Sequence, residues 1–146
     1  MGTDYAIRNP ADFSWLINGF VQRVPSVTHA LLLSSDGFPL TASESVSSDG
    51  AEQLAAIASG LLGLARNSAA IFDKGSCELI IIRLSRGYFL FMGIGEYAGL
   101  AVLTSARCNM KAVAYEMTQF VDTAAGALTP KARADLRRVI TARRAD

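Results

Sequence analysis

Few residues in this chain could carry out chemistry, and their spacing matches no common catalytic or ligand-binding motif. There is one histidine, His29, inside the apolar stretch from Val27 to Leu33, and there are two cysteines, Cys77 and Cys108. Neither cysteine has CxxC spacing or a neighbouring histidine, so a zinc site is not expected. The sequence also lacks a P-loop, a GxSxG elbow, an HExxH motif and a calcium-binding loop. It therefore predicts a protein that is not an enzyme and needs no metal or cofactor.

Three groups of residues allow a functional and a structural interpretation. The segment Gly93-Ile-Gly95-Glu-Tyr-Ala-Gly99 is glycine-rich, but it lacks GxGxxG spacing and lies between two predicted strands, which favours a turn over a nucleotide site. His29 could be a ligand or a base, but a single histidine in an apolar strand is more typical of a core or interface position. The two cysteines have no activating base nearby in the sequence, which favours unreactive thiols.

Two arginines, Arg83 and Arg86, flank a predicted strand-to-strand turn. A regulator of a nucleotide-hydrolysing enzyme could insert such a guanidinium group against developing phosphate charge, as an arginine finger does. A solvated turn explains the same two residues, and we favour that interpretation. Arg86 is kept as a candidate contact with a partner protein.

The composition predicts one compact domain with a substantial core. The chain has 146 residues and a mass of 15.5 kDa, with 51% hydrophobic and 18% charged residues. Its longest uncharged stretch, Gln53 to Ala65, is shorter than the roughly 20 apolar residues of a membrane-spanning helix. The N-terminal residues carry no recognisable export or lipidation signal. We therefore expect a cytoplasmic protein with no transmembrane segment.

Helix signals occur in three places. Asn9 with Pro10 and Asp12 is typical of a helix start, and apolar residues at helical spacing then continue to Val24. A second helix is predicted from Gly50 to about Phe72, with Asp49 as its N-cap and Glu52 completing a capping box. A third is predicted to begin after Asn109. Its apolar stripe consists of Met110, Val113, Ala114, Met117, Phe120, Val121 and Ala124.

Short apolar runs between these helices predict five strands. The runs 27–34 and 38–44 are separated by Asp36-Gly37, which is a strong hairpin signal. The runs 77–84, 87–94 and 97–104 follow one another across short turns, as in an antiparallel meander. The predicted order is αββαβββα, an α+β fold with a five-stranded antiparallel sheet.

The composition changes after Gly126, so we divide the chain into a domain, residues 1–126, and a basic C-terminal helical tail, residues 127–146. The tail has six basic and two acidic residues, a net charge of +4, and the rest has eight basic and eleven acidic residues, a net charge of −3. Three roles remain open for the tail: a helix that docks on the domain or on a partner, a membrane or nucleic-acid patch, and a solvated tail. Arg137 and Arg138 are candidate partner contacts, and nucleic acid is not an expected partner.

The strands and the second helix both indicate that one copy of the chain leaves apolar surface uncovered. Segments such as Leu79 to Ile82 are apolar at successive positions, so both faces of the sheet need cover. A single helix, about 10 Å wide, cannot cover five strands spaced nearly 5 Å apart. A second copy could supply the missing helix. Gly60 and Gly63 in the second helix would then allow close approach of another backbone, although they could instead pack on the chain's own sheet.

The pattern resembles the roadblock/dynein-light-chain family, specifically its bacterial branch. The resemblance covers about residues 9–125 and rests on the element order and on three segments: Leu31-Leu-Leu-Ser-Ser-Asp-Gly-Phe-Pro-Leu40, Glu52-Gln-Leu-Ala-Ala-Ile-Ala-Ser-Gly-Leu-Leu62, and the helix after Asn109. It implies a roadblock/profilin-like sheet with helices on both faces, and a homodimer formed through the second helices and the third strands. The residues expected in this dimer interface are Leu54, Ile57, Ala58, Gly60, Leu61, Gly63, Leu79, Ile80, Ile81, Ile82 and Arg83.

The resemblance also implies a function. Members of this family are regulators and scaffolds for small Ras-like GTPases, and bacterial members are typically encoded beside such a GTPase and a sensor-kinase-like membrane protein. In some bacterial members the dimer accelerates GTP hydrolysis by its partner. Two alternatives stay open: a passive adaptor in a sensor-linked signalling assembly, and a small ligand-sensing module.

Overall fold

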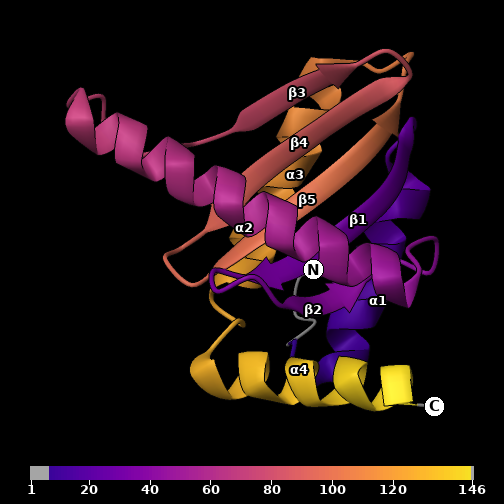
Figure 1. Cartoon of the computed structure of the whole chain (residues 1–146). Coiled ribbons are helices and arrows are strands. Elements are labelled where there is room, and N and C mark those ends of the chain that lie inside the picture. Colours follow the sequence, from indigo (N-terminus) through magenta and orange to yellow (C-terminus); the bar gives the residue numbers. More distant parts are fainter. Residues whose placement is uncertain (1–6, 146) are drawn as a thin grey trace.

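The computed structural model, which describes residues 7–145, contains one five-stranded antiparallel sheet (Figure 1). The strands are β1 (Val27–Ser34), β2 (Pro39–Ala42), β3 (Ile80–Leu84), β4 (Gly87–Ile94) and β5 (Ala98–Ser105). Their order in the sheet is β2-β1-β5-β4-β3. The two edge strands are therefore β2 and β3.

Helices lie on both faces of this sheet, which confirms the predicted α+β fold. Helices α1 (Pro10–Arg23) and α3 (Met110–Ala125) cover one face, and α2 (Ser48–Ile71) crosses the other (Figure 1). A fourth helix, α4 (Pro130–Ala145), follows α3 and packs against β2 and α1.

The helix starts follow the predicted capping chemistry in all but one case. The Asn9 side chain accepts a hydrogen bond from the Asp12 N–H at 3.1 Å, and the Asp12 carboxylate accepts one from the Asn9 N–H at 3.2 Å. Asn109 caps α3 in the same way. The predicted N-cap of α2, Asp49, is wrong. Ser47, two residues before Asp49, caps that helix instead. Its hydroxyl accepts the Gly50 N–H at 3.0 Å and so satisfies one of the free N–H groups at the start of the helix.

Two predicted strands are too long. The second strand ends at Ala42 and not at residue 44, because the Ser43 hydroxyl accepts the Ala30 N–H at 3.1 Å where a strand carbonyl would otherwise do so. The third strand begins at Ile80 and not at residue 77. Its pairing with β4 runs only from Ile80 opposite Phe91 to Leu84 opposite Gly87, so the segment before Ile80 is outside the sheet.

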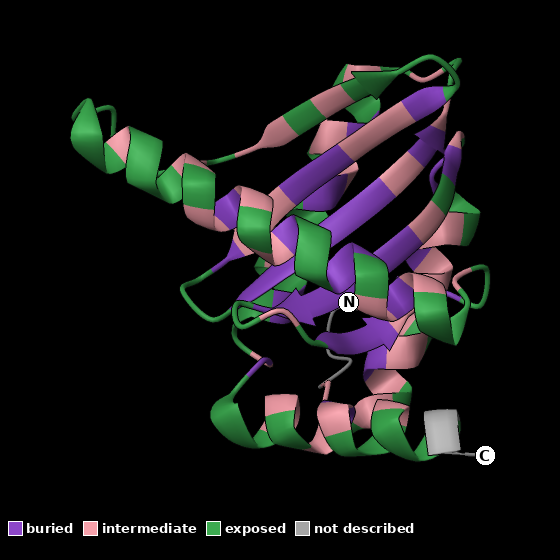
Figure 2. Ribbon diagram, viewed as in Figure 1, coloured by how far each residue is buried: buried purple, intermediate pink, exposed green. Residues whose placement is uncertain are grey.

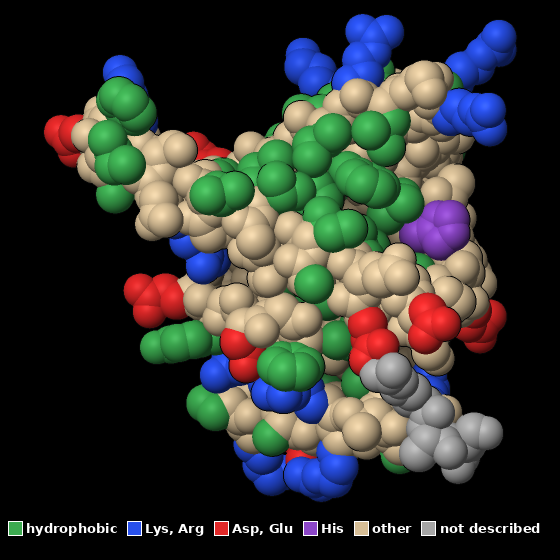
Figure 3. Space-filling view, in the orientation of Figure 1, with side chains coloured by type: hydrophobic (Ala, Val, Ile, Leu, Met, Phe, Trp, Pro, Cys, Tyr) green, Lys and Arg blue, Asp and Glu red, His purple; other side chains and the backbone are tan. Residues whose placement is uncertain are grey.

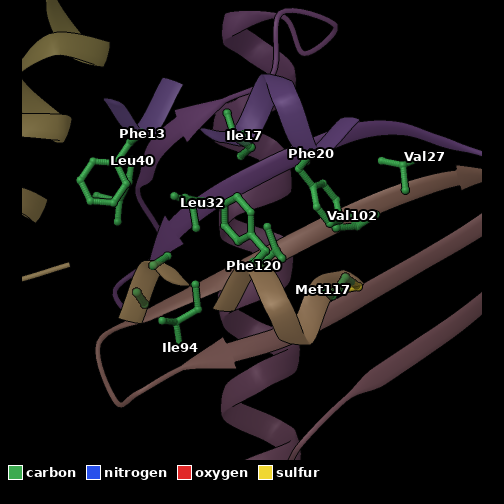
Figure 4. Close-up of a cluster of buried hydrophobic side chains, with 14 of the residues drawn as sticks. Phe13, Ile17, Phe20, Val27, Leu32, Leu40, Ile94, Val102, Met117 and Phe120 are labelled. Carbon is green, nitrogen blue, oxygen red and sulfur yellow. The ribbon is translucent and has the colours of Figure 1, made fainter. Parts of the chain in front are cut away.

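The core forms two layers, one on each face of the sheet, as the apolar strands predict. The layer under α1 and α3 contains Phe20 and Phe120, whose rings meet edge to face with centroids 5.4 Å apart (Figure 4). The layer under α2 is smaller, and it consists of Leu31, Leu33, Ala51, Leu54, Ala55, Ala58, Leu62, Phe91 and Ala101. Successive residues of β1 alternate between the two layers, which explains why that strand is apolar throughout.

Helix α4 docks on the domain, so the interpretation of the C-terminal segment as a solvated tail is wrong. Leu136 is buried, and the Arg137 guanidinium carbon lies 3.9 Å from the centroid of the Phe38 ring. Arg137 also lies 3.6 Å from the Asp36 carboxylate. These contacts attach α4 to the β1–β2 hairpin.

Candidate functional site

Helix α2 is longer than the sheet surface beneath it. Its buried residues, Ala51, Leu54, Ala55, Ala58 and Leu62, all belong to the N-terminal two-thirds of the helix. The remainder projects beyond β3 with its side chains exposed (Figures 1 and 2). The C-terminal third of α2 is therefore an overhang with no strand of this chain beneath it.

One flank of α2 forms a continuous line of mostly apolar side chains, which we call the α2 seam. Its members, Ile57, Leu61, Leu64, Ser68 and Ile71, are spaced by alternating steps of four and three residues. This spacing is that of the contact positions in paired helices. Ile57, Leu64 and Ile71 are 50%, 66% and 74% exposed, far more than buried core residues. The α2 seam has the pattern of a helix–helix contact but faces solvent.

The sheet beside the α2 seam is also uncovered. A groove of about 340 Å³ runs between α2 and the strands, with Ile57 on one side and Phe89 and Leu103 on the other. Ile80 and Ile82 lie on the same face of the sheet and are only partly buried. The space-filling view shows hydrophobic side chains gathered over this region (Figure 3). Contiguous apolar surface of this kind is typical of a protein–protein interface.

Strand β3 borders this surface and forms a free edge. It is hydrogen-bonded to β4 only, and Ile81, Arg83 and Leu84 are exposed. The opposite edge strand, β2, is in contact with α4. A free strand edge can pair with a strand of another chain. Within residues 7–145, the α2 seam and the β3 edge together form the main uncovered apolar surface.

Apart from the two glycines, the structure places the predicted interface residues in three groups. Ile57, Leu61, Ile80 and Ile82 lie together on the uncovered α2 face. Leu79 packs on the opposite side of the sheet, as part of the core under α3, and Ile81 and Arg83 alternate onto that side too. Leu54 and Ala58 are buried against the chain's own sheet. The side chains of these last two residues are thus largely occupied within one copy, although Leu54 also lines the groove beside Ile57.

Gly60 and Gly63 lie away from the sheet. A Cβ atom built at either position would meet no atom of the described chain within 4 Å, apart from the helix's own backbone. The interpretation that these glycines pack on the chain's own sheet is therefore wrong. At 3.6 residues per turn, both glycines lie on the side of α2 that is opposite Ala51 and Ala58.

Sequence reasoning missed five apolar residues of this surface. They are Leu64, Ile71 and Phe72, which are exposed on the overhang, and Phe89 and Leu103, which are partly buried on the sheet. The four-and-three spacing from Ile57 to Ile71 was a readable signal for the first two of these residues. Phe89 and Leu103 belong to apolar strands that need cover on both faces, but which of their residues border the groove depends on how far α2 extends sideways over the sheet.

The three arginines predicted to contact a partner differ in their surroundings. Arg86 is exposed in the turn between β3 and β4 and makes no ion pair within the described residues. Arg137 is engaged by Phe38 and Asp36 of its own chain. Arg138 donates to the Asp135 carboxylate at 3.0 Å. Of these three arginines, only Arg86 makes no contact of this kind within the described residues, and Arg137 serves the docking of α4.

No arrangement of ionisable groups in the described part of the chain has the geometry of a metal site. The His29 Nδ1 lies 2.7 Å from the neighbouring Thr28 hydroxyl, and Cys77 and Cys108 are free thiols. Helix α2 is the only described helix with the length and hydropathy of a membrane span, a property that core helices of soluble proteins share. Its N-terminal part forms half of the α2 layer of the core.

Comparison with known proteins agrees with this architecture. The family model "Roadblock/LC7 domain" matches residues 13–104. A Roadblock/LC7 domain from Streptomyces avermitilis is 34% identical, with a TM-score of 0.75, over 79% of this chain and 96% of that one. Among curated proteins, no significant sequence match was found.

Two more distant structures share the fold. MglB from Myxococcus xanthus is 10% identical, with a TM-score of 0.73, over 81% of this chain and 88% of that one. Profilin IB from Acanthamoeba castellanii is 15% identical, with a TM-score of 0.52, over 76% of this chain and 98% of that one.

Proposed function

The chain belongs to the Roadblock/LC7 domain family, and from that membership we propose that it is a homodimeric regulator and scaffold for a small Ras-like GTPase. The observation that carries the proposal is the family match, which spans nearly two-thirds of the chain. The uncovered α2 seam and β3 edge support it, because a regulator without an active site works through its surfaces.

The placement of the two uncovered features supports self-association. If a second copy continues the sheet beyond β3, its strands lie beneath the α2 overhang of the first copy, and the twofold symmetry gives the reverse contact. The exposed flank of each α2 then meets the other helix. One operation thus covers the strand edge, the groove and the overhang of both copies.

The apolar surface is large enough to hold such a dimer. Fully burying one large apolar side chain contributes about 1.5–3 kcal/mol. Ile57, Leu64, Ile71 and Phe72 are 50–74% exposed, and the dimer would bury two copies of each. Their burial amounts to on the order of 10 kcal/mol, which is comparable to the 4–15 kcal/mol or so that association costs in lost freedom. The hydrogen bonds of the strand edge and the rest of the groove add to it.

The regulator acts on the GTPase by differential binding. A surface that binds one nucleotide state of the partner more tightly shifts the partner's equilibrium by the ratio of the two affinities and no further. We infer that the protein has no active site of its own and holds the switch loops of the GTPase in place. It works in the cytoplasm, beside a sensor-kinase-like membrane protein, and does not bind nucleic acid.

Binding and turnover assays with the small GTPase encoded beside this protein test the proposal. We expect the affinity for the GTPase loaded with a GTP analogue to differ at least tenfold from that for the GDP form. Equal affinities, or no complex at all, would contradict the regulator function. A complex with unchanged hydrolysis and exchange would indicate the passive adaptor instead.

The Arg86→Ala variant tests how hydrolysis would be stimulated. An arginine finger contributes about 10³–10⁵ to the rate, whereas a partner that orders switch loops needs no such residue. We expect the variant to keep most of the stimulation. A loss of a hundredfold or more with an unchanged complex and an unchanged dimer would identify Arg86 as a finger.

A further inference from the structure

The edge strand β3 and its flanking charges carry an inference about how two copies recognise each other. We propose that β3 pairs with β3 of a second copy in one register, centred on Ile82, in which Glu78 of each copy meets Arg86 of the partner subunit. The inference rests on the proposed homodimer and adds to it the register and the pair of residues that select the partner.

The two faces of the sheet restrict the choice of register. Residues that lie opposite each other in an antiparallel pair point to the same face. Ile80 and Ile82 belong to the α2 face, whereas Leu79 packs in the core under α3. In a strand that alternates, Ile81 and Arg83 share the face of Leu79. An even-numbered residue of one copy must therefore lie opposite an even-numbered residue of the other. This condition places the twofold axis between one residue and the same residue of the second copy.

Only one of these registers pairs the whole strand. Centred on Ile82, all five residues of β3 find a partner, with Ile80 opposite Leu84 and Ile81 opposite Arg83. A shift to Ile81 or to Arg83 leaves three paired residues. The shift to Arg83 also sets two guanidinium groups directly opposite each other, which is destabilising. Strand overlap and charge both favour Ile82.

The same register brings together two opposite charges that have no partner within one copy. Glu78 lies two residues before β3 and Arg86 two residues after it, in the turn that leads to β4, so the register centred on Ile82 brings Glu78 of one copy and Arg86 of the other to the same end of the paired strands. Both are exposed, and neither makes an ion pair or a side-chain hydrogen bond within the described residues. In the proposed pairing, the arginine side chain reaches back from the turn toward the Glu78 carboxylate.

Exposed ion pairs contribute little to affinity, but they discriminate strongly between right and wrong partners. Two attractive pairs in the dimer become two repulsive ones when either residue is reversed. The two ion pairs therefore favour pairing with a chain that carries the same charges at these positions, and they disfavour a shifted register. Salt would weaken this discrimination, because both pairs are solvent-exposed.

Charge reversal in the full chain tests the pairing. We expect Glu78→Arg and Arg86→Glu each to raise the dimer dissociation constant by about fivefold or more at low salt. Mixing the two variants restores both attractive pairs, so differently tagged chains should form heterodimers in preference to either homodimer. The matched control pair is Glu44→Arg and Arg8→Glu, two exposed residues beside β2 and α1 at the opposite edge of the sheet. This pair should show no preference.

A cysteine series tests the register directly. In a chain with Cys77 and Cys108 replaced by alanine, Ile82→Cys places two thiols directly opposite each other and should form an intermolecular disulfide on oxidation. Ile81→Cys should not, because its counterpart lies diagonally, beyond the 7 Å or so that a disulfide can span between Cα atoms. Cross-linking through Ile81→Cys alone would overturn the register centred on Ile82.

The outcomes separate this inference from the dimer itself. If the wild-type chain is a dimer and neither charge variant weakens it, or the mixed variants show no preference, the Glu78–Arg86 pairing is wrong and the dimer stands. If the wild-type chain is a monomer at all accessible concentrations, both proposals fail.

Discussion

Individual residues in this protein are constrained most tightly where two strands come closest. Gly87 begins β4 directly opposite Ser105, and a Cβ atom at this position would lie 2.1 Å from the Thr104 carbonyl oxygen. No side chain fits without moving β5. The backbone conformation of Gly87 is ordinary, with no positive φ, so the constraint is close contact and not strain.

We therefore expect Gly87→Ala to destabilise the fold by about 1–3 kcal/mol, the usual result of forcing extra volume into a packed site. Thermal unfolding of the purified variant measures this. Gly19→Ala is the matched control, because Gly19 lies inside α1 with no atom within 4 Å of an added Cβ. That variant should be unchanged or more stable by up to about 1 kcal/mol. Equal melting temperatures for the two variants would contradict the close contact.

Among the ionisable groups that the structure describes, Asp135 on α4 has a clearly shifted pKa. The hydrogen bond from the Lys131 ammonium is the largest cause, and it lowers the pKa of this carboxyl below 3.8. Desolvation opposes this shift, and the charges of Lys131 and Arg138 and the hydrogen bond from Arg138 lower the pKa further. Because the folded pKa is the lower one, the stabilising contribution is complete above the unfolded value and is lost as pH falls through the folded value.

This sign predicts that α4 loosens as the pH is lowered below about 4. Amide exchange of α4, followed by NMR between pH 5 and pH 2, should show rising opening of this helix relative to α1. The Asp135→Asn variant should lose that dependence on pH while the rest of the chain behaves as before. A helix α4 that is equally protected across the range in the wild-type chain would contradict the assignment.

At the scale of elements, the sequence predicts the sheet and the first three helices well because their signals are local. The Asn9 and Asn109 caps and the Asp36-Gly37 turn each act within a few residues. The N-cap of α2 was wrong because Ser47 and Asp49 both fit the local rule. The Ser47 hydroxyl accepts the Gly50 N–H, and the sequence rule alone does not rank the two candidates.

The surface of α2 was predicted less completely, for a related reason. The abundance of apolar residues on α2 was readable from the sequence, but the split between core and seam depends on where the helix lies over the strands. Leu54 and Leu64 are equally apolar, yet one is 8% exposed and the other 66% exposed. The docking of α4 likewise depends on Phe38 and Asp36, about a hundred residues earlier in the chain.

Helix α4 offers a direct test of docking. Leu136 is 2% exposed, so Leu136→Ala should weaken the attachment of α4 by about 2–4 kcal/mol, the usual effect of truncating a buried leucine. Amide exchange within residues 130–143 should become faster, and the sheet should be unaffected. Arg138→Ala, a side chain 75% exposed, is the control and should change little. Slower or unchanged exchange in Leu136→Ala would show that α4 does not dock through this face.

At the scale of the whole molecule, the two edge strands of the sheet differ in what covers them. The β2 edge is in contact with α4, and the β3 edge is free beside an overhanging helix. A chain with one free edge can form a closed pair by joining like edges, whereas two free edges would permit open-ended growth. The basic charge of α4 is partly balanced by Asp36 of the same chain, so the charge separation seen in the sequence contributes to docking.

Sedimentation velocity of the full-length protein at micromolar concentration tests the central claim, that twofold self-pairing covers the α2 seam and the β3 edge. The account predicts a species of twice 15.5 kDa for the wild-type chain, and a folded monomer when Ile57 and Leu64 are both replaced by aspartate. A wild-type protein that sediments as a stable single copy would contradict it.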